Sequence, residues 1–260
     1  MPESKHDYYM KDQLLEHSNV EKDLGVMIDS KLTFDQHISS IVKKANSLAG
    51  LIRRSFEYMD KKMFRQLFTT IVRPHLEYAA AVWNPHLRRH IIAFENVQKR
   101  ASKLVPGLRD LPYKERLKAL NLPTLVYRRY RGDMIEMYKL THDMYDEDVV
   151  AGFLDLQPRI SRGHPYNVYR RGLNKNLEVR INFNSFKVRV TEQWNNLPED
   201  VVVASDINIF KNRLDKLWYG SEVYFDHECE LKKLTSARST RHAHLNATLN
   251  EINVDLISEA

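Results

Sequence analysis

The recurrence of apolar residues at steps of three and four constrains the fold of this chain more than any other feature. In the clearest case, seven apolar residues between Ile38 and Ile52 form one stripe along a helix. Only 8 glycines and 9 prolines occur in 260 residues, which disfavours a turn-dense β-sandwich. We therefore predict a mainly α protein: a thumb-like helical bundle preceded by a short β-hairpin, then a second small, mostly helical C-terminal region and a mobile tail.

The same pattern places the individual elements. The apolar run Leu24–Asp29 is typical of a strand, and Lys31–Thr33 could return as its partner in a hairpin, although a self-contained hairpin packed on the helices is an equal alternative. Thr33 and Gln36 have the spacing of a capping box at the start of the first helix. Further helices are expected from Asp60 to Trp83 with a break or kink at Pro74, from His90 to Val105, from Tyr113 to Leu120, from Thr124 to about Asp143, up to Leu197, and after a Ser205 cap.

Composition shifts divide the chain into regions. Residues 140–158 contain five acidic side chains and no Lys or Arg, which is typical of a linker. The periodicity fades after Tyr219, and the last residues are polar. We expect five regions: a hairpin at 1–33, a helical domain at 34–145, an acidic linker loop at 146–165, a small helical region at 166–219, and a mostly disordered tail at 220–260.

Basic residues are concentrated in one block. Between Lys31 and Lys139 there are 22 Lys or Arg and 9 Asp or Glu, whereas both flanking segments are net negative. Clustered cations attract phosphates whatever the base sequence, so the block favours a nucleic-acid partner over helix sides that merely face solvent. We predict that ten side chains contact phosphate: Lys43, Lys44, Arg53, Arg54, Lys99, Arg100, Lys103, Arg128, Arg129 and Arg131. In this interpretation Gln98 shares the outward side of its helix with Lys99 and Arg100.

The sequence also indicates in which cellular compartment the protein resides. The single cysteine, Cys229, excludes an internal disulfide, which suits a reducing environment. The first twenty residues are polar, and the longest apolar run, Ala79–Trp83, is far shorter than the ~20 residues that span a bilayer. We expect a soluble intracellular protein, nuclear or cytoplasmic, with no membrane partner.

Signatures of an active site are absent from the sequence. There is no GxGxxG, Walker-type, GxSxG or HExxH motif, and the acidic clusters lie in expected loops without an adjacent apolar strand. His227 and Cys229, with His242 and His244, offer zinc ligands, but accidental clustering is favoured because no second cysteine exists. Trp83, Trp194 and Trp218 could stack on bases, although their helical stripes favour burial. We predict no catalytic residue, no metal site and no cofactor in this chain.

A series of short motifs carries a family resemblance. They are, in order, Glu21-Lys22-Asp23-Leu24-Gly25-Val26, Leu32-x-Phe34-x-x-His37-Ile38, Lys44-Ala45-Asn46, Leu51-Ile52-Arg53-Arg54-x-Phe56, Val72-Arg73-Pro74-His75-Leu76-Glu77-Tyr78-Ala79, Val82-Trp83-Asn84-Pro85, Glu95-x-Val97-Gln98-Lys99-Arg100-Ala101, Leu117-x-x-Leu120-x-Leu122-Pro123, Tyr127-Arg128-Arg129-x-Arg131-Gly132-Asp133-Met134, Trp194-Asn195-x-Leu197-Pro198 and Phe210-Lys211-x-Arg213-Leu214-Asp215. Over about residues 20–218 the chain resembles the C-terminal part of the reverse transcriptases of non-LTR (LINE-type) retrotransposons, jockey-like elements in particular.

This resemblance implies roles for the regions. The hairpin at Leu24–Leu32 would be the primer-grip region at the end of the palm, and the helices from Phe34 to Met137 would be the thumb, which holds an RNA–DNA hybrid or template–primer duplex. The catalytic aspartates of the family, which bind Mg²⁺ in the intact enzyme, lie upstream of the matched motifs. The resemblance therefore implies a fragment of an RNA-directed DNA polymerase that is inactive alone and whose other partners are the missing palm and fingers. The alternative is a helical protein-interaction module without a nucleic-acid role.

Overall fold

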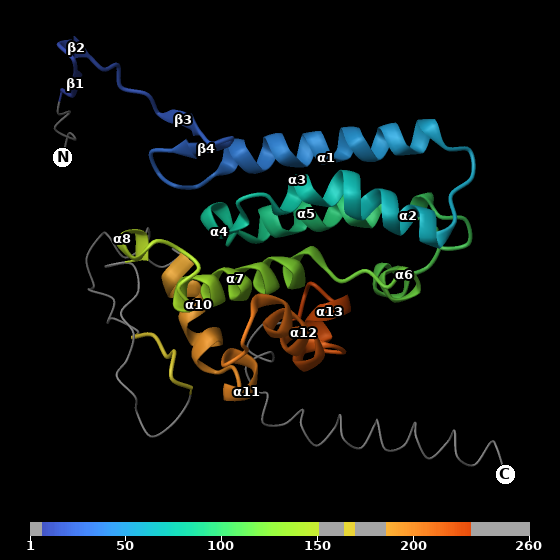
Figure 1. The fold of residues 1–260 in the computed structure, drawn as a ribbon. Coiled ribbons are helices and arrows are strands. Elements are labelled where there is room, and N and C mark those ends of the chain that lie inside the picture. Colours follow the sequence, from blue (N-terminus) through green and yellow to red (C-terminus); the bar gives the residue numbers. More distant parts are fainter. Residues whose placement is uncertain (1–6, 151–163, 170–185, 230–260) are drawn as a thin grey trace.

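The computed structural model describes residues 7–150, 164–169 and 186–229 and shows a mainly α protein (Figure 1). The predicted fold class, helices preceded by a β-hairpin, is confirmed. The strands are β1 Tyr9–Met10, β2 Gln13–Leu14, β3 Val20–Asp23 and β4 Val26–Asp29. The helices are α1 Asp35–Ser55, α2 Lys61–Leu67, the π-helical η1 Phe68–Val72, α3 Arg73–Glu77, α4 Ala80–Trp83, α5 Arg88–Ala101, the 3-10 turn η2 Ser102–Leu104, α6 Tyr113–Leu120, α7 Leu125–Thr141, α8 Glu147–Val150, α10 Phe186–Asn195, α11 Glu199–Val202, α12 Ile207–Trp218 and α13 Glu222–Phe225.

The helices lie in successive layers. In Figure 1, α1 forms the outer layer, α3 and α5 lie beneath it, α7 follows, and α10, α12 and α13 cover the far side of α7. Direct packing of α1 on α5, of α5 on α7, and of α7 on α10 and α12 agrees with this order. In the described part of the chain, no helix combines the length and the apolarity needed to cross a membrane.

The main hairpin differs from the predicted one. Strand β4 pairs antiparallel with β3, which precedes it, so the prediction that Lys31–Thr33 supplies the partner was wrong. The two residues of the turn, Leu24 and Gly25, both have positive φ angles, of 43° and 87°. Such a two-residue turn matches the right-handed twist of the strands, and glycine adopts it readily. A second, smaller hairpin pairs β1 with β2.

The start of α1 also differs from the predicted capping box. Phe34 occupies the N-cap position with a left-handed φ of 56° and provides no side-chain cap. Asp29, at the end of β4, instead accepts hydrogen bonds from the backbone N–H of Phe34 (2.6 Å) and from the N–H and hydroxyl of Thr33 (both 3.1 Å). Burial would raise the pKa of Asp29, but these hydrogen bonds outweigh it and lower the pKa. One carboxylate thus joins the hairpin to α1.

Pro74 disturbs its helix without ending it. Asp60 caps α2, accepting from the N–H of Met63 at 2.7 Å. The chain then widens into the π-helical turn η1, in which the N–H of Arg73 bonds to the carbonyl of Phe68, and continues as α3. Because proline has no N–H, a wider turn just before it accommodates the missing hydrogen bond. The predicted break or kink at Pro74 takes the form of a π turn, and the helix is interrupted later, between Glu77 and Ala80, where Ala79 has a left-handed φ of 52°.

Buried apolar side chains form two clusters that meet within α7. The first extends from Val26 to Leu125 and the second from Val126 to Val223. Trp83 lies in the first, and Trp194 and Trp218 lie in the second, which confirms the prediction that all three are buried in the core. The clusters therefore divide at α7 and not at the acidic segment 146–165, although the domain boundaries themselves stay predictions.

The C-terminal elements pack back onto α7. Asp206, and not the predicted Ser205, caps α12 by accepting from the N–H groups of Asn208 (2.7 Å) and Ile209 (3.0 Å). Helix α13 lies within the predicted tail, and the hydroxyl of Thr124 donates to the carbonyl of Val223 at 2.7 Å. Several predicted features lie outside the described residues: most of the linker, Phe183, and the tail beyond residue 229.

Candidate nucleic-acid interface

Four of the predicted phosphate contacts share the outer side of α1. A helix advances about 100° per residue, so Lys43 and Arg54, three turns apart, project in nearly the same direction. Lys44 and Arg53 lie on either side of them, and all four are exposed. The buried residues of α1 (His37, Ile38, Ala45 and Ile52) face the bundle instead. In the described part of the molecule, none of the four cations forms an ion pair or a hydrogen bond, so their charge is uncompensated.

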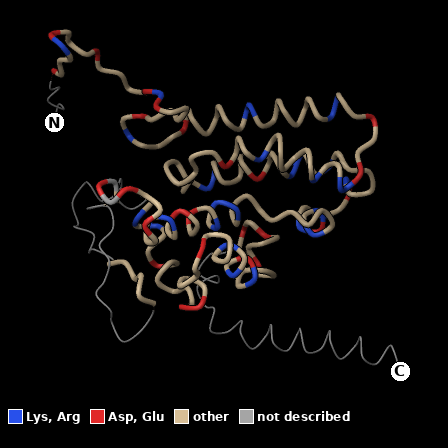
Figure 2. The backbone as a smooth tube through the Cα atoms, viewed as in Figure 1, with Lys and Arg blue, Asp and Glu red and all other residues tan. Residues whose placement is uncertain are grey.

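Three further predicted contacts lie at the end of α5. Lys99 and Arg100 occupy its last turn and Lys103 lies in the following 3-10 turn, all three exposed. Helices α1 and α5 begin at the same end of the bundle, where Arg89 Nη2 contacts Asp35 Oδ1 at 2.9 Å, and run in the same direction. Figure 2 shows Lys and Arg along both helices toward the end where they finish. The structure therefore places the cations of α5 toward the same end of the bundle as Arg53 and Arg54 of α1.

Gln98 does not share this outward side. It is 1% exposed, and its amide donates to the Tyr113 hydroxyl (3.1 Å) and to the carbonyl of Pro123 (2.9 Å). The prediction that Gln98 faces solvent beside Lys99 was therefore wrong. A buried amide needs such partners, and they come from α6 and from the α6–α7 connection.

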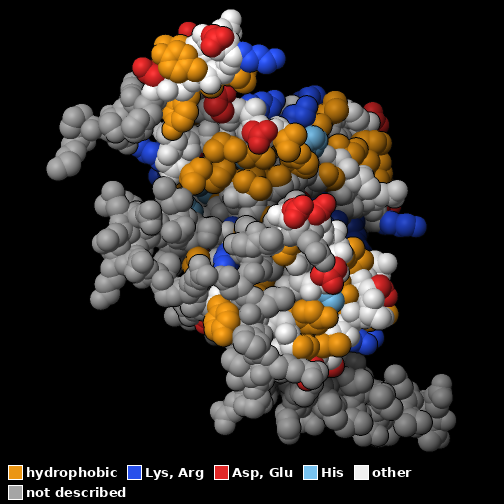
Figure 3. Space-filling model, turned by 60° about the vertical axis from the view of Figure 1, so that its left-hand side comes forward, with side chains coloured by type: hydrophobic (Ala, Val, Ile, Leu, Met, Phe, Trp, Pro, Cys, Tyr) orange, Lys and Arg blue, Asp and Glu red, His pale blue; other side chains and the backbone are white. Residues whose placement is uncertain are grey.

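Large apolar side chains are exposed near the helices that carry these cations. They include Leu24 in the turn of the main hairpin, Tyr78 after α3 and Val82 in α4. The Tyr78 hydroxyl donates to the carbonyl of Leu24 at 2.9 Å, so the hairpin and this helical segment lie together. Figure 3, which brings this side forward, shows a band of apolar side chains across the upper half of the molecule. Such a band is typical of a surface that another protein covers.

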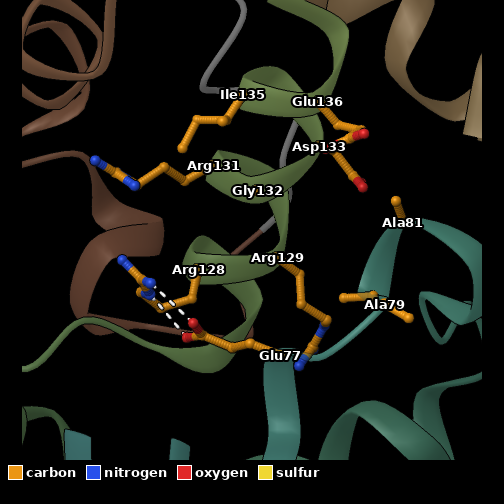
Figure 4. A pocket seen from close by; sticks show the side chains of 11 residues that line it. Glu77, Ala79, Ala81, Arg128, Arg129, Arg131, Gly132, Asp133, Ile135 and Glu136 are labelled. Atoms are coloured by element: carbon orange, nitrogen blue, oxygen red, sulfur yellow. Dashed lines mark hydrogen bonds and ion pairs between the residues drawn. The ribbon is translucent and has the colours of Figure 1, made fainter. Parts of the chain in front are cut away.

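The three arginines of α7 differ from the cations of α1 and α5. Arg128 binds Glu77 through two hydrogen bonds of 2.8 Å each, and Arg131 binds Asp215 in the same bidentate manner. Figure 4 shows that these two side chains lie on one side of α7, whereas Arg129 projects on the opposite side toward Ala79. Arg129 is only 4% exposed, and its guanidinium lies 5.1 Å from the centre of the Phe94 ring.

These contacts remove the α7 arginines from the proposed interface. A phosphate would have to displace a carboxylate from Arg128 or Arg131, and Arg129 does not reach the surface. Burial lowers the pKa of Arg129, with Glu95 acting in the opposite direction, and no hydrogen-bond partner reaches its Nη1 atom. The seven cations of α1, α5 and η2 are thus the predicted residues that remain accessible to a nucleic acid.

An ion-pair network and two basic residues of the site were not predicted from the sequence. Arg189 of α10 contacts Asp133 of α7 at 2.9 and 3.0 Å, and Asn84 after α4 donates to the same carboxylate at 2.9 Å.

Arg65 and Arg73 lie on α2 and α3 beside Arg128 and Arg131 and line a pocket with them. Their spacing of eight residues, about two helical turns, was the available signal, but only the packing of α7 against these helices reveals the cluster.

No metal centre is formed by the described residues. Among residues 7–150, 164–169 and 186–229, no group of three or more His, Cys, Asp or Glu side chains is placed to hold an ion. His227 lies against Tyr113 with ring centres 5.8 Å apart, whereas His242 and His244 lie outside the described ranges.

Two known proteins resemble parts of the chain. One is an uncharacterised protein of Caenorhabditis elegans, 27% identical over 114 residues, which cover 43% of this chain and 58% of that protein. The other is a probable RNA-directed DNA polymerase from transposon X-element of Drosophila melanogaster, 26% identical over 104 residues. The chain is distantly similar to part of a transposon RNA-directed DNA polymerase. No protein-family model and no solved structure matches it.

The similarity covers only a short part of the polymerase. The match to the transposon polymerase covers 38% of this chain and 11% of the polymerase, so the chain spans well under two thirds of that relative. A relation to retrotransposon reverse transcriptases agrees with the sequence motifs. The finer predictions, a jockey-like origin and the thumb assignment, stay predictions.

Proposed function

We propose that this chain is the nucleic-acid-binding thumb and C-terminal region of a retrotransposon RNA-directed DNA polymerase, and that α1 and α5 hold an RNA–DNA hybrid or template–primer duplex. One observation carries the proposal: seven exposed cations without ion-pair partners in the described part of the chain lie on α1, on α5, which packs beside it, and in the turn η2 that follows α5. Lysine and arginine side chains of this kind bind the phosphate backbone without reading its sequence. The similarity to a transposon polymerase supports the same conclusion.

The experiment titrates the protein into a fluorescently labelled RNA–DNA hybrid and measures anisotropy at several salt concentrations. The double variants Lys43→Gln/Lys44→Gln and Arg53→Gln/Arg54→Gln each remove two charges from α1. Each should weaken binding and make the dependence of log affinity on log salt shallower, by about 1.8 if both residues contact phosphate, taking the B-DNA slope as a guide.

The matched control is Lys211→Gln/Lys216→Gln, which removes two charges from α12. It should bind the hybrid nearly as well as the unmodified protein does. Equal losses in the α1 variants and the control would indicate attraction to net charge alone and would refute the interface. Binding that is absent, or that does not respond to salt, would refute the proposal as a whole.

We further propose that polymerase chemistry requires a palm that this chain does not supply. The matched motifs all follow the catalytic aspartates in the family that the sequence resembles. A primer-extension assay with Mg²⁺, template and nucleotides should therefore give no product with this chain alone. Extension above background, absent from a mock purification, would contradict this part of the proposal.

The second candidate function is a helical protein-interaction module. It is favoured by the exposed apolar band near the main hairpin and α4 (Figure 3). A surface of this kind would be covered by the palm of the same polymerase or by another subunit. Concentration-dependent self-association in sedimentation velocity, together with no detectable binding of the hybrid, would favour this function over the first.

A further inference from the structure

Four arginines converge on one pocket between the two clusters of buried side chains. Arg65 and Arg73 come from α2 and α3, and Arg128 and Arg131 come from α7. The pocket has a volume of about 370 Å³ and is also lined by Asp215 and by Tyr127, Tyr219 and Tyr224. We call it the arginine pocket. It lies on the side of α7 opposite to Arg129.

The positive charge in this pocket is only partly balanced. Glu77 accepts two hydrogen bonds from Arg128, and Asp215 accepts two from Arg131, so both carboxylates are occupied by the α7 arginines. Arg73 Nε lies 3.5 Å from Glu77, beyond these short contacts, and no other partner of Arg73 lies in the described part of the chain. Arg65 is exposed and has no ion-pair or hydrogen-bond partner among the described residues. Four guanidinium groups therefore face two carboxylates.

The pKa of Arg73 also indicates that positive charge in the pocket is in excess. Its pKa is lowered by burial and then by the charges of Arg128, Arg65 and Arg131, while Glu77 acts in the opposite direction. An anion in the pocket would relieve this repulsion. A phosphate monoester carries a charge of about −1.5 to −2 near pH 7, close to the surplus of two positive charges, and its oxygens fit the planar N–H edge of a guanidinium.

The tyrosines indicate what the phosphate is attached to. Tyr219 is 59% exposed, and its ring lies 5.8 Å from that of Tyr224, which in turn lies 4.7 Å from that of Tyr127. Bases stack on exposed aromatic rings of this kind irrespective of sequence. We infer that the arginine pocket binds a nucleotide phosphate, with Arg65 and Arg73 contacting the phosphate and Tyr219 next to the base. The source is either a free nucleotide or the phosphorylated end of a strand, so the inference goes beyond the duplex surface on α1 and α5.

The test compares adenosine monophosphate with adenosine by isothermal titration calorimetry. The phosphate should be required, so that the monophosphate binds and adenosine binds at least tenfold more weakly. The variant Arg65→Gln/Arg73→Gln should weaken binding of the monophosphate about tenfold or more. Its matched control, Lys61→Gln/Lys62→Gln, removes two exposed charges from α2, the helix that carries Arg65, without touching the pocket and should change the affinity less than twofold.

A second ligand pair distinguishes the two sources. Short oligonucleotides with a 5′-phosphate or a 5′-hydroxyl are titrated in the same way. Tighter binding of the 5′-phosphorylated oligonucleotide than of its 5′-hydroxyl counterpart assigns the pocket to a strand end, and equal binding of these two assigns it to free nucleotides. Both outcomes support the inference. Equal affinities for adenosine and its monophosphate, or equal losses in the arginine and lysine variants, would overturn it.

A measurement on the unmodified protein tests the site without any variant that could misfold. The side-chain Nε–Hε NMR signals of Arg65 and Arg73 should shift on addition of the monophosphate, whereas that of Arg54 on α1 should not. Hybrid binding by the α1 surface is measured separately, so a failure of the pocket and a failure of the proposed function give different results. Signals that do not move at saturating monophosphate would refute the site.

Discussion

At the scale of single residues, the stability of this fold depends on how buried charges are paired. Asp133 is 2% exposed, and burial raises its pKa while hydrogen bonds from Arg189 and Asn84 lower it. Arg189 also donates to the carbonyl of Ala81 at 2.6 Å. One carboxylate thus connects α4, α7 and α10. Buried charges of this kind are tolerated only because each has a partner.

Replacing Asp133 by Asn should lower the free energy of unfolding by about 3–5 kcal/mol, because the buried ion pair with Arg189 would lose its negative charge. Denaturant unfolding followed by circular dichroism measures the change. The control is Asp215→Asn, which breaks the pair with Arg131 at a carboxylate that is 44% exposed. Solvent screens that pair, so the loss should be about 1 kcal/mol or less. Equal losses at both positions would contradict the role of burial.

At the scale of elements, the spacing of apolar residues explains where most helices lie but not how they end. The spacing of apolar residues predicted α6 and most of α1, α5 and α7 because the helical period depends only on neighbours along the chain. The caps of α1 and α12 were predicted only in part. The Thr33 hydroxyl accepts from the N–H of Asp35 at 3.4 Å, but Phe34 and not Thr33 is the N-cap residue of α1, and Asp206 rather than Ser205 caps α12. A cap is decided by which oxygen reaches a free N–H, and several nearby residues compete for it.

The turn of the main hairpin offers a prediction at this scale. Leu24 has a positive φ angle and is 84% exposed, so its side chain gains little from burial while its backbone is strained. Leu24→Asn should raise the free energy of unfolding by about 0.5–1 kcal/mol, because asparagine adopts this turn conformation more readily. Thermal or denaturant unfolding measures it. The same change at Leu51, exposed on α1, should destabilise slightly, since asparagine is a weaker helix former.

At the scale of the whole molecule, α7 links the two clusters of buried apolar side chains. Its first residue, Leu125, belongs to the first cluster, and Val126 to Tyr138 contribute to the second. The hydrogen bonds from Asn84 to Asp133 and from Thr124 to Val223 cross the same boundary. Disrupting either cluster would therefore expose part of α7 and weaken the other.

We accordingly expect one cooperative unfolding transition. Trp83 reports on the first cluster and Trp218 on the second, so two variants each retain one of them: Trp194→Phe/Trp218→Phe and Trp83→Phe/Trp194→Phe. Within each variant, the tryptophan fluorescence and the far-ultraviolet circular dichroism should change at the same urea concentration. A fluorescence midpoint that precedes or follows the circular dichroism midpoint would show that the clusters unfold separately.

The candidate site was only partly predictable from sequence. The cations of α1 were placed correctly on its exposed side because the apolar stripe of the same helix defines the opposite side. The arginines of α7 carry a similar local signal, yet Arg128 and Arg131 are paired and Arg129 is buried. Their partners lie 51 residues away at Glu77 and 84 residues away at Asp215. Nothing in the local pattern records such distant pairs.

The amino-acid sequence by itself therefore determined that the chain is mainly helical, where most helices run, and that basic residues gather in its first half. These properties depend on period and composition, which are local. Only the tertiary structure decided which charges stay accessible, because pairing and burial depend on elements brought together from distant parts of the chain. For the same reason it alone placed Arg65 and Arg73 beside α7 and formed the arginine pocket.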